Sequence, residues 1–255
     1  MRGFVYIAWV AMLTLVGSRA HAGLVVAFDN ASNYATGWTN NSNGGYGFNP
    51  WNITLSGGGS RNIFIGNPNA AGITDFGTNA FSIFANPTSS TARVYADRSF
   101  ISQLGVGHTF HLDWAVNLDA GGGSKGFSLY SGGAGASLLL DIGHTNAGAI
   151  TFNNIDTGIA YGTGPMTWSF TMMNPGELFV SATGRDGNTN NVFSTTVSVS
   201  GSPDAFRLYA GAMSGETTRQ PYYNNFAIIV PEPGAMLLML IGMAGAGIWR
   251  RRAGI

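Results

Sequence analysis

The chain contains no cysteine, and only 9% of its 255 residues are charged. The lack of cysteine excludes a disulfide scaffold, so packing and backbone pairing must stabilise the fold. The formal net charge is zero, which excludes a disordered polyelectrolyte and leaves no basic excess to bind a phosphate backbone. No stretch between the two ends shows the apolar stripe of a three-turn helix. With 38 glycines, the composition instead favours strands joined by tight turns.

The N-terminal residues have the pattern of an export signal. Arg2 precedes an apolar run over residues 4–16, and the small residues Ala20 and Ala22 follow it. This order is typical of a secretory signal peptide. We therefore expect residues 1–22 to be removed by cleavage before Gly23. An uncleaved anchor is the alternative, although the run is shorter than the about 20 apolar residues that a span needs.

The C-terminal residues form a second targeting segment, residues 231–255. It consists of Pro231, Glu232 and Pro233, an apolar run over residues 235–249, and the cluster Arg250, Arg251 and Arg252. The apolar run can cross only a thin bilayer core, as a short transmembrane helix. The arginines favour a cytoplasmic end, which leaves the rest of the chain outside.

These three parts, in this order at the end of the chain, resemble the PEP-CTERM sorting signal. The resemblance implies that the tail is recognised and cut by an exosortase in a Gram-negative bacterium that makes exopolysaccharide. It also implies export through the inner membrane, transient anchoring, and release to the cell surface or beyond. The alternative is an ordinary C-terminal anchor that stays in the membrane.

The middle, residues 23–230, is expected to be one all-β domain. Apolar residues alternate with small or polar residues in short runs that end at Gly, Asn, Pro or Ser, which predicts two antiparallel sheets packed as a single sandwich. Seven basic and eleven acidic residues give this part a net charge of 7 − 11 = −4. Its strand density is similar to that of lectin-like, carbohydrate-binding jelly rolls. In that architecture the first and last strands, residues 24–30 and 224–230, lie side by side.

The sequence offers no catalytic constellation, so we predict that the protein is not an enzyme. Ser124 matches G-x-S-x-G, but the following residues alternate as a strand, whereas the nucleophile elbow needs a helix. Glycosidases need two carboxylates at one site, and Glu177 and Glu216 lie in different segments. Asp113 and Asp119 are better explained as solvated surface residues.

Two metal hypotheses remain, beside the expectation of no cofactor. His111 and Asp113 share one face of a predicted strand, with His108 out of phase, which gives at most a weak transition-metal site. A solvated sheet face explains the same residues. Asp186, Asn188 and Asn190 have the spacing of half a calcium loop, although a hairpin turn needs the same residue types. Calcium could also bind where Asp29 and Asn30 meet Asn224 and Asn225, if the terminal strands pair.

Aromatic side chains are the candidates for glycan binding, because sugar rings stack on exposed flat rings. Trp51, Trp114 and Trp168 occupy the inward phase of strands and are expected in the core. The candidates on exposed loops are Trp38, Tyr46, Tyr222 and Tyr223. The alternative for Trp38 is that it folds back and closes the sandwich.

The sequence therefore predicts an exported, non-catalytic surface or matrix protein, sorted through its tail, with polysaccharide as a candidate ligand. A purely structural surface protein without a ligand is the first alternative, and an exported hydrolase is the second. Nucleic acid is not an expected partner.

Overall fold

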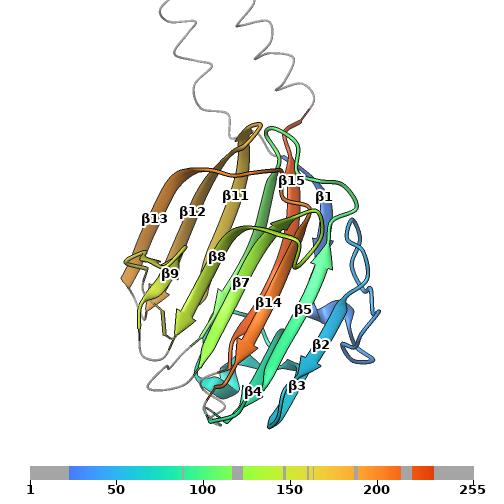
Figure 1. Ribbon diagram of the computed structural model, residues 1–255, viewed down its shortest axis with the longest axis vertical. Helices are drawn as coiled ribbons and strands as arrows, with labels where there is room; N and C mark the ends of the chain where they lie inside the picture. The colour runs from blue at the N-terminus through green and yellow to red at the C-terminus, as the bar shows by residue number, and fades with distance from the viewer. Residues whose placement is uncertain are drawn as a thin grey trace, which may run out of the picture. The chain divides into compact units, whose positions relative to one another are not determined.

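The computed structural model describes residues 23–232, except for residues 88, 117–122, 146–147, 160, 163, 187–188 and 214–219. Within this range, Val25–Val230 form one compact unit built of strands and two short 3-10 helices, η1 (Ala31–Asn33) and η2 (Pro68–Ala71). The predicted all-β fold is confirmed, and its two sheets pack face to face as a sandwich (Figure 1).

The larger sheet has eight strands. In spatial order they are β13 (Thr189–Ser198), β12 (Glu177–Asp186), β11 (Met166–Asn174), β6 (Thr109–Ala115), β15 (Tyr222–Val230), β4 (Ala80–Asn86) and β3 (Ser60–Gly66), with β1 (Leu24–Asp29) also paired to β15. The first and last strands are therefore neighbours, as the sequence predicts. A bulge between Asn224 and Ala227 interrupts the β15–β6 register.

The smaller sheet has seven strands. In spatial order they are β10 (Ile155–Asp156), β9 (Ile150–Phe152), β8 (Ser137–Thr145), β7 (Ser124–Ser131), β14 (Ala205–Gly211), β5 (Arg93–Ser99) and β2 (Asn52–Ser56). In Figure 1, β8, β7, β14 and β5 lie side by side across the middle of the view. Neighbours in space here are far apart in sequence, since β14 lies between β5 and β7.

The core is dominated by aromatic rings from both sheets. Trp51, Trp114 and Trp168 are fully buried, which confirms the inward phase expected for them. Phe206 lies between the layers and packs against Trp51 at 5.6 Å and Phe226 at 4.9 Å between ring centroids. Burying a side chain of this size stabilises the fold by about 1.5–3 kcal/mol. Aromatic packing thus takes the stabilising role that disulfides have in other small exported domains.

Candidate functional site

Trp38 does not form an exposed platform. Its side chain is only 3% exposed and packs edge-on against Trp51 at 5.2 Å and Phe81 at 4.9 Å. The expectation of a glycan-stacking ring at this position is therefore wrong, and the alternative, a ring that folds back onto the core, holds. The physical reason is that the large apolar ring gains more by filling the space beside Trp51 than by facing water.

Tyr222 and Tyr223 are also buried, at 1% and 0% exposure, so the expectation that they are exposed is wrong. They open β15, an interior strand, and consecutive strand residues face opposite sides. Tyr223 faces the main core and donates a 2.8 Å hydrogen bond to the Gly126 carbonyl. Tyr222 faces the other side, where Ile73 and Phe76 cover it. Of the four aromatic candidates, only Tyr46 is exposed, at 55%.

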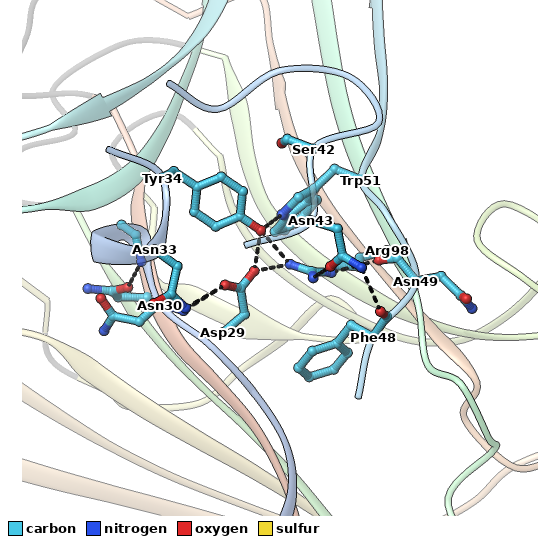
Figure 2. Close-up of polar contacts among 12 residues, drawn as sticks. Asp29, Asn30, Asn33, Tyr34, Ser42, Asn43, Phe48, Asn49, Trp51 and Arg98 are labelled. Atoms are coloured by element: carbon cyan, nitrogen blue, oxygen red, sulfur yellow. Dashed lines mark hydrogen bonds and ion pairs between the residues drawn. The ribbon is translucent and has the colours of Figure 1, made fainter. Parts of the chain in front are cut away.

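A buried polar network holds the segment that contains Trp38 (Figure 2). Its centre is an ion pair between Arg98 on β5 and Asp29 on β1, with both side chains fully buried. The Tyr34 hydroxyl donates to Asp29 at 2.6 Å, and it accepts from Trp51 Nε1 at 2.9 Å and from Arg98 Nη1 at 3.0 Å. Arg98 also donates to the Asn49 carbonyl at 2.9 Å. The network therefore ties residues 29–51 to β5.

Burial sets the ionisation of this network. Desolvation lowers the pKa of Arg98 to about 9, and the contact with the Asp29 carboxylate acts against that shift. Burial likewise raises the pKa of Tyr34. The guanidinium also lies 4.9 Å from the Trp51 ring centroid. Because Arg98 is enclosed by acceptors and rings, we assign the network a structural role.

The same contacts bear on the calcium hypothesis for Asp29 and Asn30. Asn30 donates to the Asn225 side chain at 2.6 Å, and the Ala31 amide donates to the Asn224 side chain at 2.9 Å. These residues do meet, as expected from adjacent terminal strands. The Asp29 carboxylate, however, is paired with Arg98, which neutralises the charge that would attract a cation.

The proposed metal residues on the larger sheet are engaged by protein groups. His111 Nε2 lies 3.6 Å from Asp113 Oδ1, and His111 Nδ1 lies 3.1 Å from Ser169 Oγ. Asp113 accepts hydrogen bonds from Thr167 at 2.8 Å and Asn225 at 2.7 Å. His108 instead accepts from the Gly105 amide. The described part of the chain contains no group of three or more His, Cys, Asp or Glu residues that could hold a metal ion.

Two other sequence candidates lie in or beside hairpins. Ser124 begins strand β7, so the residues after it are a strand and not the helix of a nucleophile elbow. Asp186 ends β12 and pairs with Thr189 of β13, while Asn188 lies outside the described residues. Asp186 and Asn190 are described only through their backbone pairing, so calcium at this turn stays a prediction.

A hollow of about 460 Å³ lies between the segment that holds Trp38 and strand β3. Tyr34, Trp38, Ile63 and Ile65 line it, with Ser32 among its polar groups. None of its lining residues is charged at neutral pH, since Tyr34 is the one ionisable side chain among them and burial raises its pKa. The hollow has no set of polar groups that point to one place and could orient a ligand. It is therefore a weaker candidate for a binding site than the surface described next.

The outer face of the smaller sheet carries a group of aromatic and charged side chains, some of them buried and some partly exposed. We call it the tyrosine face, and it consists of Tyr95, Asp97, Ser128, Tyr130, Asp141, Arg207 and Tyr209. Two rows of direct strand pairs build it. The first row runs Asp141–Ser128–Arg207–Asp97, and the second runs Gly143–Gly126–Tyr209–Tyr95.

Arg207 is the centre of the tyrosine face. Its Nε and Nη2 donate to the two carboxylate oxygens of Asp97 at 2.6 and 2.8 Å. This bidentate bond raises the pKa of Arg207. The guanidinium also lies 4.4 Å from the Tyr95 ring centroid and 5.4 Å from that of Tyr130. The arrangement therefore fixes a flat cation between two aromatic rings.

The hydroxyl of Tyr209 lies close to two glycines, Gly126 and Gly143. A Cβ at Gly126 or Gly143 would approach the Tyr209 hydroxyl to 2.7 or 2.6 Å, which is a clash. The hydroxyl lies 3.4 Å from Asp141 Oδ2, and Ser128 donates to Asp141 Oδ1 at 2.7 Å. Burial, with the nearby Asp141 charge, raises the pKa of Tyr209. The phenol therefore stays neutral and can donate or accept a hydrogen bond at physiological pH.

Sequence reasoning missed this face because it looked for aromatic residues in loops. The available signal was the repeated pairing of a tyrosine with a polar residue two positions away, as in Tyr95-x-Asp97, Ser128-x-Tyr130 and Arg207-x-Tyr209. Each pair occupies one face of a strand. Only the order of the strands shows that the three pairs lie together.

Comparison with solved structures finds similar chains at low sequence identity. The chain is similar to the globular domain of T. cruzi calreticulin, with 7% identity, a TM-score of 0.46, and coverage of 88% of this chain and 94% of that one. It is also similar to the cellulose-induced protein Cip1, with 9% identity, a TM-score of 0.44, and coverage of 70% and 90%. A third is TmCBM61 in complex with β-1,4-galactotriose, with 8% identity, a TM-score of 0.35, and coverage of 69% and 86%.

Family comparison identifies the tail. No curated protein matches the chain. No helix among the described residues is long and apolar enough to cross a membrane, and the predicted tail helix lies outside them. The model of the PEP-CTERM protein-sorting motif, however, matches residues 230–252, which include Pro231–Pro233 and the arginine cluster. The chain therefore carries a PEP-CTERM sorting motif, as its last residues predict, and this motif indicates an exported protein sorted by an exosortase.

Proposed function

We propose that the exported chain is a non-catalytic glycan-binding protein, and that it binds extracellular polysaccharide on the tyrosine face. The observation that supports this most is the fixed arrangement of Arg207 between Tyr95 and Tyr130. Planar polar groups beside aromatic rings suit the hydroxyls and apolar ring faces of a sugar. Tyr95, Arg207 and Tyr209 are partly exposed on this face, whereas Tyr130 and Asp97 are buried, so a polymer would contact the face mainly through the first three side chains.

The spacing of the two carboxylates on this face supports binding without hydrolysis. Asp97 on β5 and Asp141 on β8 are three strand spacings apart, since β14 and β7 lie between them. At about 4.8 Å per spacing, the backbones that carry them are about 14 Å apart. Glycosidase carboxylates lie about 5–9.5 Å apart. The pair is thus too widely separated to act on one glycosidic bond.

The charge on the face favours a neutral polymer. Asp97 neutralises Arg207, so Asp141 gives the tyrosine face one net negative charge. The whole domain has a net charge of −4 by sequence. A polyanionic glycan would meet repulsion at low salt. We therefore expect cellulose, xylan or galactan to be better ligands than alginate.

A retention assay on immobilised polysaccharides tests the proposal. Residues 23–230, which contain the compact unit, are passed over neutral and acidic polymers with and without calcium. We expect retention on at least one neutral polymer, independent of calcium, and at least tenfold weaker retention for Arg207→Met. The matched control is Arg61→Met, which alters an arginine on β3 of the other sheet and should leave retention unchanged.

Three outcomes would contradict parts of this proposal. Folded protein that no polymer retains contradicts glycan binding and favours the purely structural alternative. Equal loss in the two arginine variants contradicts the tyrosine face as the site. Release of reducing sugar from a bound polymer contradicts the non-catalytic assignment.

A further inference from the structure

Both ends of the domain leave the sandwich at the same end. The contacts of Asn30 with Asn225 and of Ala31 with Asn224 place the end of β1 beside the start of β15. The two paired strands are therefore antiparallel, and Leu24 lies near Val230. Figure 1 shows β1 and β15 as neighbours. We call this end of the sandwich, with its connecting loops, the exit end.

Exposed apolar side chains gather at the exit end. Six large hydrophobic residues there are between 40% and 66% exposed: Leu24, Val25, Val26, Ile101, Val106 and Met173. Three backbone contacts locate the last three. The Ile101 amide donates to the carbonyl of Gly47, which lies against Val26 and Ala27 of β1. The Gly107 amide donates to the Met172 carbonyl, and Thr109 pairs with Ile229 of β15. Clustered exposed apolar residues of this kind mark an interaction surface.

The loops of the exit end carry few charged side chains. Those that the structure describes, residues 100–108, 132–136, 175–176 and 199–204, contain no Lys or Arg. Asp204 accepts bonds from the amides of Gly132 and Gly133, and Glu177 accepts one from Asn174. A surface with few free charges loses little hydration when it approaches an apolar phase.

The length of the connection to the tail limits what the exit end can face. Only Pro231–Gly234 separate Val230 from the apolar run 235–249. Four fully extended residues span at most about 14 Å. The headgroup layer on each side of a bilayer is about 5–8 Å thick. A tail inserted in the membrane thus holds the exit end at or just above the headgroups.

We propose that, until the tail is cut, the exit end rests on the outer surface of the membrane and inserts its apolar side chains into the interface of the lipids. The contact is mainly hydrophobic, because the described loops of the exit end contribute no Lys or Arg and cleavage before Gly23 would add only one α-amino group. It orients the domain upright, with the strands running away from the bilayer. The proposal rests on membrane insertion of the tail and is independent of glycan binding.

Depth-dependent quenching of single labels tests this contact. The chain has no native cysteine, so Ile101→Cys gives one label at the exit end. Val192→Cys gives a control label six residues from the end of β13, about 20 Å along the strand from the exit end. Residues 23–255 carrying an environment-sensitive dye are placed in phosphatidylcholine nanodiscs, at one chain per disc, with quencher near the headgroups. We expect at least threefold stronger quenching at position 101 than at position 192.

A longer linker separates real contact from mere tethering. With 20 Gly/Ser residues inserted after Val230, we expect the quenching at position 101 to persist. Adding Val25→Ser, Val106→Ser and Met173→Ser to the long-linker chain should abolish it. The matched control, Leu55→Ser with Ile155→Ser, removes exposed apolar residues outside the exit end and should change nothing.

Three results would overturn the proposal. The first is loss of quenching when the linker alone is lengthened, which means that the tether explains proximity. The second is equal quenching at positions 101 and 192, which means that the domain lies on its side or tumbles. The third is a label at position 101 that becomes shielded from water only when two chains share a disc. That result would assign the apolar surface to contact with a second copy.

Discussion

Strand β5 contains, in successive residues, one half of each of two arginine–aspartate pairs. Arg98 points inward and pairs with Asp29, and both side chains are fully buried. Asp97 points outward and pairs with Arg207, whose side chain is 21% exposed. The two pairs have the same chemistry on opposite sides of one sheet.

The difference between them separates a structural role from a binding role. A buried ion pair must be fully satisfied, because each unpaired charge in the interior costs several kcal/mol. Tyr34, Trp51 and Asn49 provide that satisfaction around Arg98. The outer pair keeps some contact with water, with side-chain exposures of 21% for Arg207 and 9% for Asp97, so a charge left there without its partner costs less. Arg207, held between Tyr95 and Tyr130 and partly open to water, can therefore meet a ligand, whereas Arg98 cannot.

The largest expected effect comes from breaking the inner pair. Arg98→Met leaves the Asp29 carboxylate buried without its cation, so we expect the free energy of unfolding to fall by about 3–5 kcal/mol. The matched outer variant, Arg207→Met, should lose less, about 1–3 kcal/mol, because water can still reach part of the Asp97 carboxylate. Urea unfolding of both proteins measures the difference. Similar losses in the two variants would contradict the contrast between the pairs.

A smaller effect is expected from the tyrosine hydroxyl beside each pair. Tyr34→Phe deprives the buried Asp29 and Trp51 side chains of a partner, which should cost about 1–3 kcal/mol. Tyr209→Phe removes only bonds of 3.4 Å and should cost less than about 1 kcal/mol. Thermal unfolding of the two variants checks the order, and a greater loss for Tyr209→Phe would reverse the comparison.

The smallest effect is a change in pH dependence. Burial raises the pKa of Tyr223 well above its usual value of 10.0. An acid whose folded pKa is raised stabilises the fold fully below pH 10, and this contribution is lost as the pH rises, because the unfolded chain ionises first. Tyr223→Phe should therefore make the decline of unfolding free energy above pH 10 less steep.

Urea midpoints at pH 9, 10 and 11 measure this slope. The lowered pKa of Arg98 acts in the opposite direction above about pH 9, but it is common to both proteins and cancels in their difference. Parallel curves for parent and variant would show that the Tyr223 phenol does not contribute to the slope.

The sequence predicts those features that depend on local pattern. The alternation around Trp51, Trp114 and Trp168 identifies core strands, and the residues from Pro231 onward identify the sorting motif. Trp38 could not be placed in this way, because no alternation surrounds it and its burial depends on Phe81, more than 40 residues later.

The tyrosine face was out of reach for a related reason. Asp97 and Arg207 are 110 residues apart, and they meet only because β14 inserts between β5 and β7. Local periodicity gives the face of a strand on which a side chain lies, but it does not give the order of strands in a sheet. Binding surfaces built across several strands therefore require the topology.

The attachment of the tail to β15 has a mechanical consequence. β15 is an interior strand, bonded to β6 on one side and to β4 and β1 on the other. If a polymer binds the smaller sheet as proposed, a pull from the membrane on residue 231 loads a strand with neighbours on both sides. The ladder bonds then share the load in shear, whereas an edge strand such as β3 would peel away bond by bond. A domain connected in this way is suited to bear tension between a cell and the material around it.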